Sequence, residues 1–256
     1  MQLASWNVNS INVRLPQVLA YLEEGSLDLL ALQETKVPDG RFPREAFAEA
    51  GWQVLASGQN SYNGVAILSR EPAREVVLEL PEFADPQRRV LAASFGELRL
   101  INLYVPNGQA VDSPKYAYKL AWLAALERFL QTELATHGAL AVVGDFNIAP
   151  APADVHDPAA WEGRVLFSEP ERAALGRLLD LGLVDSFRLF SQPAGSFSWW
   201  DYRLNSFRRG RGLRIDLALL SRSLAARCRA SSIDADWRAQ ERPSDHAPVR
   251  VELADA

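Results

Sequence analysis

An apolar run that ends in a polar turn places the strongest constraint on how this 256-residue chain folds. Residues 139–143 read Ala-Leu-Ala-Val-Val, which indicates a β-strand buried on both faces. Gly144 and Pro150 bound the next segment and predict a tight loop. Side chains two apart on extended backbone point the same way, so Asp145 and Asn147 should face one spot. Their oxygens suit a hard cation and a polarised water, whereas the competing interpretation is an Asx-rich turn that caps the strand.

Other apolar segments predict a chain with many strands and few helices. Strands are expected at 3–8, 27–33, 52–56, 64–69, 74–80, 89–95, 98–105, 197–202, 213–220, 225–233 and 249–253. Helices are expected at 15–24, 44–49 and 171–181, and from Pro114, with Ser113 as N-cap, to a stop at Gly138. Strands and helices do not alternate strictly, so two packed sheets with helices outside fit better than a doubly wound sheet.

Charge distribution points to a polyanionic partner, although the net charge of −5 alone argues against one. Five arginines and no acid fall between residues 203 and 214: Arg203, Arg208, Arg209, Arg211 and Arg214. A local basic stripe on an acidic body can still steer a polyanion. The single Cys228 excludes an internal disulfide and fits a reducing cytoplasm. We expect no membrane span and no secretory signal, because no stretch has the required apolar length or charge pattern.

Polar clusters stand where predicted strands end. They are Asn7-Val8-Asn9, Gln33-Glu34-Thr35, Asp145-Phe146-Asn147 and Ser244-Asp245-His246. Asp216 interrupts an apolar strand, where an acid is costly unless a histidine or a metal partners it. Each cluster alone is most simply a turn or a cap, but ligand clefts form at strand ends in sheets covered by helices. Together they predict one functional site.

Seven stretches carry a family resemblance, and they come in the family's order along the chain. They are Ser5-Trp6-Asn7-Val8-Asn9-Ser10, Leu32-Gln33-Glu34-Thr35-Lys36, Asn102-Leu103-Tyr104-Val105-Pro106-Asn107-Gly108, Gly144-Asp145-Phe146-Asn147-Ile148-Ala149-Pro150, Phe197-Ser198-Trp199-Trp200-Asp201-Tyr202, Gly212-Leu213-Arg214-Ile215-Asp216 and Ser244-Asp245-His246-Ala247-Pro248. The chain resembles the exonuclease III family, the AP endonucleases of the endonuclease/exonuclease/phosphatase superfamily, and within it the bacterial branch. The resemblance implies a single catalytic domain, 1–256, in a cytoplasmic DNA repair enzyme. Its implied fold is a four-layer αββα sandwich of two mixed or antiparallel sheets flanked by helices.

The same resemblance implies Mg²⁺-dependent hydrolysis, with Mn²⁺ as a substitute, of the DNA phosphodiester 5′ to an abasic site. Removal of nucleotides from damaged or free 3′ ends of double-stranded DNA is implied as well. Glu34 resembles the principal metal ligand, with Asn7 and Asp245 in the same shell. The full implied metal set is Asn7, Glu34, Asp145, Asn147, Asp245 and His246. Few carboxylates together with waters and a phosphate are what Mg²⁺ prefers.

Catalytic roles are implied for five residues. Asp145 resembles the residue that orients or deprotonates the attacking water, and Asn147 the amide that holds the phosphate or the nucleophile. His246, paired with Asp216, would donate to a non-bridging phosphate oxygen, since the carboxylate fixes its tautomer and favours its charged form. Tyr104 would reach the phosphate or the leaving group, whereas a strand tyrosine is otherwise most simply core.

DNA contacts are expected from two regions. Trp199 resembles the aromatic at the pocket for a flipped abasic sugar, with Leu213 and Ile215 as walls, and plain core packing is the competing interpretation. Backbone phosphates would meet Asn107 and the basic loop residues Arg203, Asn205, Arg208, Arg209 and Arg211. Leu213 stands where some relatives carry an aromatic, which leaves the balance of the two activities open. We expect a monomer, since nothing reads as a dimer seam.

Three alternatives stand beside a DNA hydrolase. Lipid, inositol-phosphate and sphingomyelin phosphohydrolases share the pattern of Glu34, Asp145, Asn147, Asp245 and His246. The stretches around Tyr104 and Trp199, and the basic loop, favour DNA. Some relatives have lost their acids and only bind, but here the acids are all present. A purely structural α/β domain would leave Asp216 and the acids at strand ends unexplained.

Overall fold

Two six-stranded sheets pack face to face in the computed structural model, which describes residues 1–254. One sheet has the order β11-β12-β1-β2-β4-β3, and the other has the order β5-β6-β7-β8-β10-β9. The first is built from β1 (Gln2–Asn7), β2 (Leu29–Gln33), β3 (Gln53–Ser57), β4 (Val65–Ser69), β11 (Cys228–Ile233) and β12 (Val249–Leu253). The second is built from β5 (Arg74–Val77), β6 (Val90–Phe95), β7 (Leu98–Tyr104), β8 (Leu140–Asp145), β9 (Leu183–Asp185) and β10 (Asp216–Ser221). Only β1–β2 and β7–β8 are parallel pairs in these sheets, so both are mixed.

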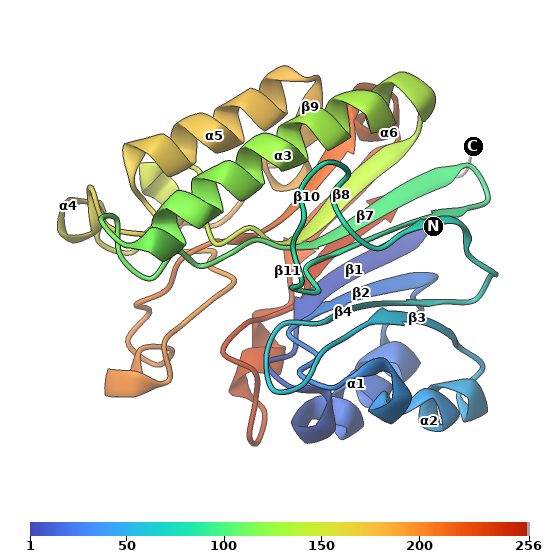
Figure 1. Ribbon diagram of the computed structural model, residues 1–256. Coiled ribbons are helices and arrows are strands. Elements are labelled where there is room, and N and C mark those ends of the chain that lie inside the picture. Colours follow the sequence, from blue (N-terminus) through green and yellow to red (C-terminus); the bar gives the residue numbers. More distant parts are fainter. Residues whose placement is uncertain (255–256) are drawn as a thin grey trace.

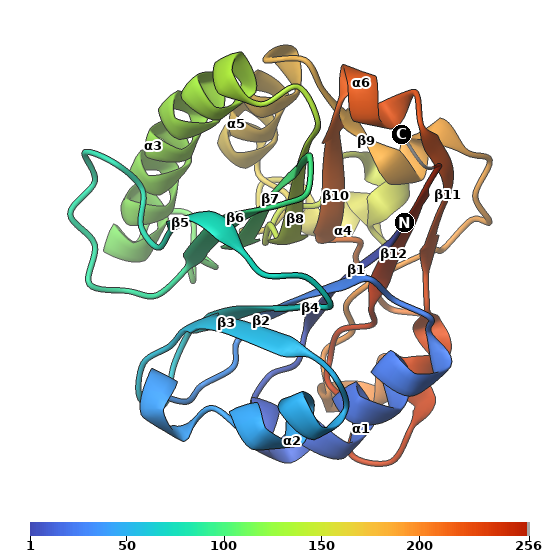
Figure 2. The same ribbon diagram turned by 90° about the vertical axis from the view of Figure 1, so that its right-hand side faces the viewer.

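Helices cover the two outer faces and complete four layers (Figure 1). They are α1 (Ile11–Glu24), α2 (Arg44–Glu49), α3 (Pro114–Thr136), α4 (Pro158–Trp161), α5 (Glu169–Asp180) and α6 (Arg222–Ala225). Helices α1 and α2 lie under the first sheet, and α3 and α5 lie over the second, as the turned view also shows (Figure 2). The expected αββα sandwich is confirmed. Within residues 1–254 we find no helix with the length and apolar character that crossing a membrane requires.

The central strands are apolar on both faces because each separates two cores. In β2, Ala31 faces the core between the sheets, whereas Leu32 faces the core under α1 and α2. In β8, Val143 faces the core between the sheets and Val142 faces α3 and α5. Strands alternate their side chains, so a strand in a four-layer fold needs apolar residues at nearly every position. This explains the unbroken apolar runs.

Strand register brings the polar ends of both sheets to one edge, away from the termini (Figure 1). In the first sheet the last residue of β1, Asn7, pairs with Gln33 at the end of β2. In the second sheet Asp145, at the end of β8, pairs with both Tyr104 and Asp216. The two edges face each other, so residues from 7 to 246 can meet in a single site.

Gly144 is required by a close approach of backbone to backbone. Its φ is +139°, and a Cβ there would lie 1.9 Å from the Leu103 carbonyl oxygen. We expect Gly144→Ala to lower the free energy of unfolding by at least ~3 kcal/mol, from strain and overpacking in a rigid strand pair. Gly176→Ala, in α5 with open space at its Cβ, should instead stabilise by about 0.5–1 kcal/mol. Urea unfolding of both variants measures this, and equal effects would refute the argument.

Several expected element boundaries were wrong. Residues 197–202 form no strand: Trp199 makes only isolated bridges to Leu213 and His246. The strand expected at 213–220 begins at Asp216, because the segment before it turns away to meet Trp199 and Val155. The strand expected at 225–233 starts only at Cys228, after the short helix α6, and β9 was not expected at all. Helix α3 has the expected Ser113 cap, but it ends at Thr136, before Gly138.

Candidate active site

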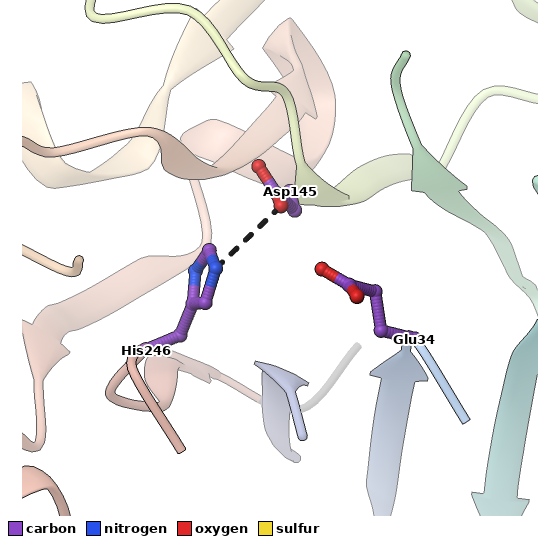
Figure 3. Close-up of side chains that lie close together, drawn as sticks. All are labelled: Glu34, Asp145 and His246. Carbon is purple, nitrogen blue, oxygen red and sulfur yellow. Dashed lines mark ion pairs between the residues drawn. The ribbon is translucent and has the colours of Figure 1, made fainter. Parts of the chain in front are cut away.

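Three ionisable side chains from distant parts of the chain converge at the common edge of the two sheets (Figure 3). Glu34 follows β2, Asp145 ends β8, and His246 lies in the loop before β12. One ligand atom from each lies within 4.8 Å of the others. His246 Nε2 is 3.8 Å from Asp145 Oδ2. The site therefore draws on both sheets, and it exists only when they pack together.

His246 is held by a buried carboxylate. Its Nδ1 lies 2.9 Å from Asp216 Oδ2, and the Ser198 hydroxyl donates to the same oxygen at 2.6 Å. Ser198 Oγ also accepts hydrogen bonds from the backbone N–H groups of residues 215 and 216, and these bonds fix the position of Asp216 at the start of β10. Burial opposes the charged imidazolium, but the carboxylates of Asp216 and Asp145 outweigh burial and raise the pKa of His246. His246 Nε2 therefore faces the site as a charged donor.

Asp145 is a buried acid with few donors of its own. Asn7 Nδ2 donates to its Oδ2 at 2.9 Å, and the Asn147 backbone N–H donates to its Oδ1 at 2.8 Å. Burial raises the pKa of Asp145, and the charge on His246 opposes that shift. A carboxylate with a raised pKa is a better proton acceptor than an ordinary aspartate, which suits a general base.

The donor set around Glu34 fits a divalent cation. Asn7 Nδ2 donates to Glu34 Oε1 at 2.9 Å as well as to Asp145, so these two carboxylates converge on one point. Lys36 Nζ lies 2.8 Å from Glu34 Oε2 and also donates to Asn9 Oδ1. Converging carboxylates repel one another, and a hard cation with oxygen ligands relieves that repulsion.

Asp245 lies beside this set, and other side chains hold both of its oxygens. Asn9 Nδ2 donates to its Oδ1 at 2.9 Å, and Trp199 Nε1 donates to its Oδ2 at 3.0 Å. Burial acts to raise the pKa of Asp245, but the charge of His246 and these two donors together outweigh burial and lower the pKa. The Asp245 carboxylate is therefore ionised, and its two hydrogen bonds fix the orientation of the side chain.

Tyr104 stands half-buried at the end of β7 with the Arg89 guanidinium 4.7 Å from its ring centroid. Burial, followed by the charges of Glu34 and Asp145, raises the pKa of its hydroxyl well above the usual value. The phenol therefore stays protonated and faces the two acids as a donor. This placement favours the site over the core interpretation.

Asn147 and Asn107 form a pair of side-chain amides. Asn107 Nδ2 donates to Asn147 Oδ1 at 3.0 Å, and Asn147 Nδ2 donates to the Val105 carbonyl at 3.0 Å. Asn147 has φ of +50°, a left-handed conformation that asparagine tolerates better than most residues. Asn147 is buried and Asn107 is exposed, so the pair reaches from Asp145 to the surface.

The expected sugar pocket is filled by apolar side chains. Leu213 and Ile215 are fully buried, and Trp199 packs against them. Val155, Leu166 and Phe167, from the segment after Pro150, pack in the same cluster. Leu166 has φ of +76°, which is unusual for leucine. We call these six residues the apolar cluster.

The basic loop projects from the body of the protein (Figure 1). It carries a 3₁₀-helix, η4 (Arg203–Asn205), and its exposed polar residues are Arg203, Asn205, Arg208, Arg209 and Arg211. Arg214 does not belong to this surface: it is 1% exposed and pairs with Asp154 and Asp185. The sequence counted it with the stripe because spacing does not show which arginine turns inward.

A family model described as "Endonuclease/Exonuclease/phosphatase family" matches residues 4–246. The chain belongs to this family. Over 266 aligned residues it is 37% identical to exodeoxyribonuclease III of Haemophilus influenzae, with 99% of this chain and 100% of the relative covered. The structure of the 3′ phosphatase NExo from Neisseria, bound to a product DNA hairpin, matches with a TM-score of 0.98 and 47% identity over both full chains. An AP endonuclease from Archaeoglobus fulgidus matches with a TM-score of 0.95 and 37% identity, again over both full chains.

Sequence reasoning missed polar residues that support the site of this endonuclease/exonuclease/phosphatase family member. Lys36 pairs with Glu34, and Ser198 holds Asp216. Both stand inside the stretches that carried the resemblance, so their polar character within those motifs was the available signal. A third residue, Lys119, lies near the start of α3, where the sequence indicated only a helix.

Proposed function

We propose that this protein is a metal-dependent hydrolase of DNA phosphodiesters that acts at abasic sites and at 3′ ends. The observation that carries the proposal is the convergence of Glu34, Asp145 and His246 from both sheets within 4.8 Å. Two acids and a charged imidazole around one point suit a phosphoryl transition state, which needs an oriented water and cationic stabilisation. The names of the relatives support DNA as the substrate.

Glu34 would be the main ligand of Mg²⁺, or of Mn²⁺ in its place, with Asn7, Asp145 and Asp245 around it. The bound ion would neutralise the charge that develops on the phosphate. Asn147 and His246 were also expected in the metal set. We assign both to the phosphate instead. His246 Nδ1 pairs with Asp216, and the raised pKa of the imidazole keeps Nε2 a donor, which cannot bind a metal. The side chain of Asn147 pairs with that of Asn107.

The chain's own groups would divide the remaining work. Asp145 orients the attacking water and accepts its proton, which its raised pKa favours. His246 Nε2 donates to a non-bridging phosphate oxygen while Asp216 keeps the imidazole charged. Asn147 and Asn107 hold the phosphate, and the protonated Tyr104 donates towards the leaving oxygen. Hydrolysis then needs no covalent intermediate with the protein.

The apolar cluster should set the ratio of the two activities. Leu166 packs in the same cluster as Trp199, and its backbone conformation suits glycine. We infer that a flipped abasic sugar beside Trp199 would displace the Leu166 side chain. We expect Leu166→Gly to raise incision at an abasic analogue relative to 3′-end removal by about tenfold, the effect of roughly 1.4 kcal/mol of steric cost. The measurement compares, for each protein, the rate of incision at the abasic analogue with the rate of nucleotide removal from a 3′ end. Leu175→Ala, which removes a buried leucine from another core, should leave the ratio unchanged, and an unchanged ratio in Leu166→Gly would refute the argument.

The basic loop should supply salt-sensitive affinity. Replacing Arg208, Arg209 and Arg211 with alanine is expected to weaken DNA binding and to flatten the slope of log affinity against log salt by up to about 2.7, at ~0.9 per phosphate contact. Binding is measured in EDTA so that no cleavage occurs. The matched control replaces the exposed Arg74, Arg128 and Arg229, which lie on other elements, and should keep the wild-type slope. An unchanged slope in the loop variant would remove the loop from the DNA surface.

Three labelled duplexes test the function directly: one with a tetrahydrofuran abasic analogue, one with a recessed 3′ end, and one with a 3′ phosphate. Wild-type protein should cleave them in Mg²⁺ and leave them intact in EDTA. Inositol phosphates and phosphorylated lipids serve as comparison substrates. If the protein released phosphate from the inositol phosphates or lipids and left all three DNA duplexes intact, it would be a phosphohydrolase of the same fold. DNA binding without any turnover would identify a binding protein.

A further inference from the structure

A buried ion pair lies directly behind the Asn107–Asn147 pair. Lys119 of α3 and Glu171 of α5 have fully buried side chains, and Lys119 Nζ pairs with Glu171 Oε1. Lys119 Nζ also donates to the Asn147 carbonyl at 2.7 Å and to the Asn107 carbonyl at 3.2 Å. One ammonium group therefore reaches both residues assigned above to the phosphate. It touches their backbone and stays out of reach of the substrate.

The second partner, Glu171, anchors the same ammonium to the segment after Pro150. Its Oε1 accepts the Leu166 backbone N–H, and its Oε2 accepts the Ser168 backbone N–H, both at 3.1 Å. Gly108, with φ of +93°, packs over the side chain of Lys119, so a Cβ there would lie 3.2 Å from the Lys119 Cδ. Three separate loops thus meet on one buried pair.

Joining two helices through a buried ion pair carries a large desolvation cost. Burial lowers the pKa of Lys119, and the charge of Glu171 opposes that shift. Replacing a buried ion pair with neutral groups is often neutral or stabilising in proteins, so stability alone does not explain its presence. What an apolar pair of the same volume would lose is the three donors of the ammonium, which fix two carbonyl oxygens in space.

We propose that Lys119 is a positioning residue that holds the loops of Asn107 and Asn147 in register for phosphate binding. The inference rests on the proposed function, because it assigns Lys119 a part in the same hydrolysis. Two contacts to backbone carbonyls set where the side-chain amides of Asn107 and Asn147 point, and the contact between those amides is 3.0 Å. Misplacement of about 1 Å at such a group can cost roughly 10²-fold in rate.

The test is the double variant Lys119→Met/Glu171→Gln. Methionine keeps the volume of the lysine, and glutamine keeps an acceptor for the helix N-terminus without leaving a charge unpaired. We expect kcat on the recessed 3′ duplex to fall about 30-fold while KM changes by less than about threefold, since the loss is one of alignment. Crystal structures should show the contact between the Asn107 and Asn147 amides formed in the wild type and broken in the variant.

The matched control is Arg99→Met/Glu133→Gln. This buried pair ties α3 to β7 of the second sheet, whereas the test pair ties α3 to α5, and it lies at the other end of α3. Its free energy of unfolding in urea should change by as much as that of the test variant, and its kcat should stay at the wild-type value. A fall in kcat no larger than in the control, or an unmoved amide pair, overturns the proposal. A wild-type protein that fails to cleave DNA would refute the proposed function, and the two structures would still decide whether Lys119 holds the loops.

Discussion

Asp145→Asn protein should hydrolyse DNA about 10³-fold more slowly than the wild type, because it keeps the shape of the site and loses the proton acceptor. The single carbonyl oxygen of asparagine can still accept from the Asn147 N–H, so the loop should keep its conformation. Asn7 Nδ2 loses Asp145 as an acceptor but keeps Glu34. Burial disfavours the charge on Asp145, as its raised pKa indicates. Without metal, the variant should therefore be at least as stable as the wild type.

Single-turnover rates in Mg²⁺ and urea unfolding in EDTA measure these two effects. Glu133→Gln serves as the comparison, because it neutralises a buried carboxylate that pairs with Arg99 away from the site. That variant should lose stability and keep its rate, which is the opposite pattern. If Asp145→Asn kept more than about a tenth of the wild-type rate, another group would have to accept the proton.

The second large effect concerns His246 and Asp216, which should behave as one catalytic unit. His246→Gln removes a charged donor and should lower kcat about 10²–10³-fold, as the loss of an oxyanion donor does. Asp216→Asn leaves the imidazole in place but removes the negative charge that keeps it protonated, and it replaces one of the two oxygens beside Nδ1 with an amide NH2 group. We expect a loss of comparable size.

A double-mutant cycle distinguishes one unit from two independent contributions. The double variant should be no slower than the slower single variant, because Asp216 acts only through His246. Rates on the abasic duplex for the four proteins give the coupling directly. Multiplicative losses would mean that Asp216 acts on the phosphate or the metal by a separate route.

Much of the site could be predicted because its residues stand at the ends of apolar strands. The strand register then brings these residues together, because Asp145 lies opposite Asp216 and Asn7 lies opposite Gln33. Asp216 was the clearest signal, since an acid at the start of an apolar strand needs a partner, and His246 provides it. The layered fold followed from the apolar runs, which alternate between two cores.

Other features depend on packing that no local pattern records. The aromatic-rich segment 197–202 was expected to form a strand, but Trp199 is held by only two isolated bridges. The inward turn of Arg214 is decided by Asp154 and Asp185, which lie far away in the sequence. Lys119 looked like an ordinary helix residue, because its partner Glu171 stands 52 positions later. Such long-range polar contacts become visible only once the layers are assembled.

We infer that one metal-dependent centre, built around Glu34, hydrolyses DNA. The most direct measurement is the initial rate of cleavage of the abasic duplex by wild-type and Glu34→Gln protein as Mg²⁺ is titrated from an EDTA-treated start. We predict no cleavage without metal, saturation of the wild type, and for Glu34→Gln a requirement for at least about tenfold more metal, since a carboxylate ligand is lost. Cleavage that persists in EDTA, or identical metal curves for the two proteins, would contradict the account.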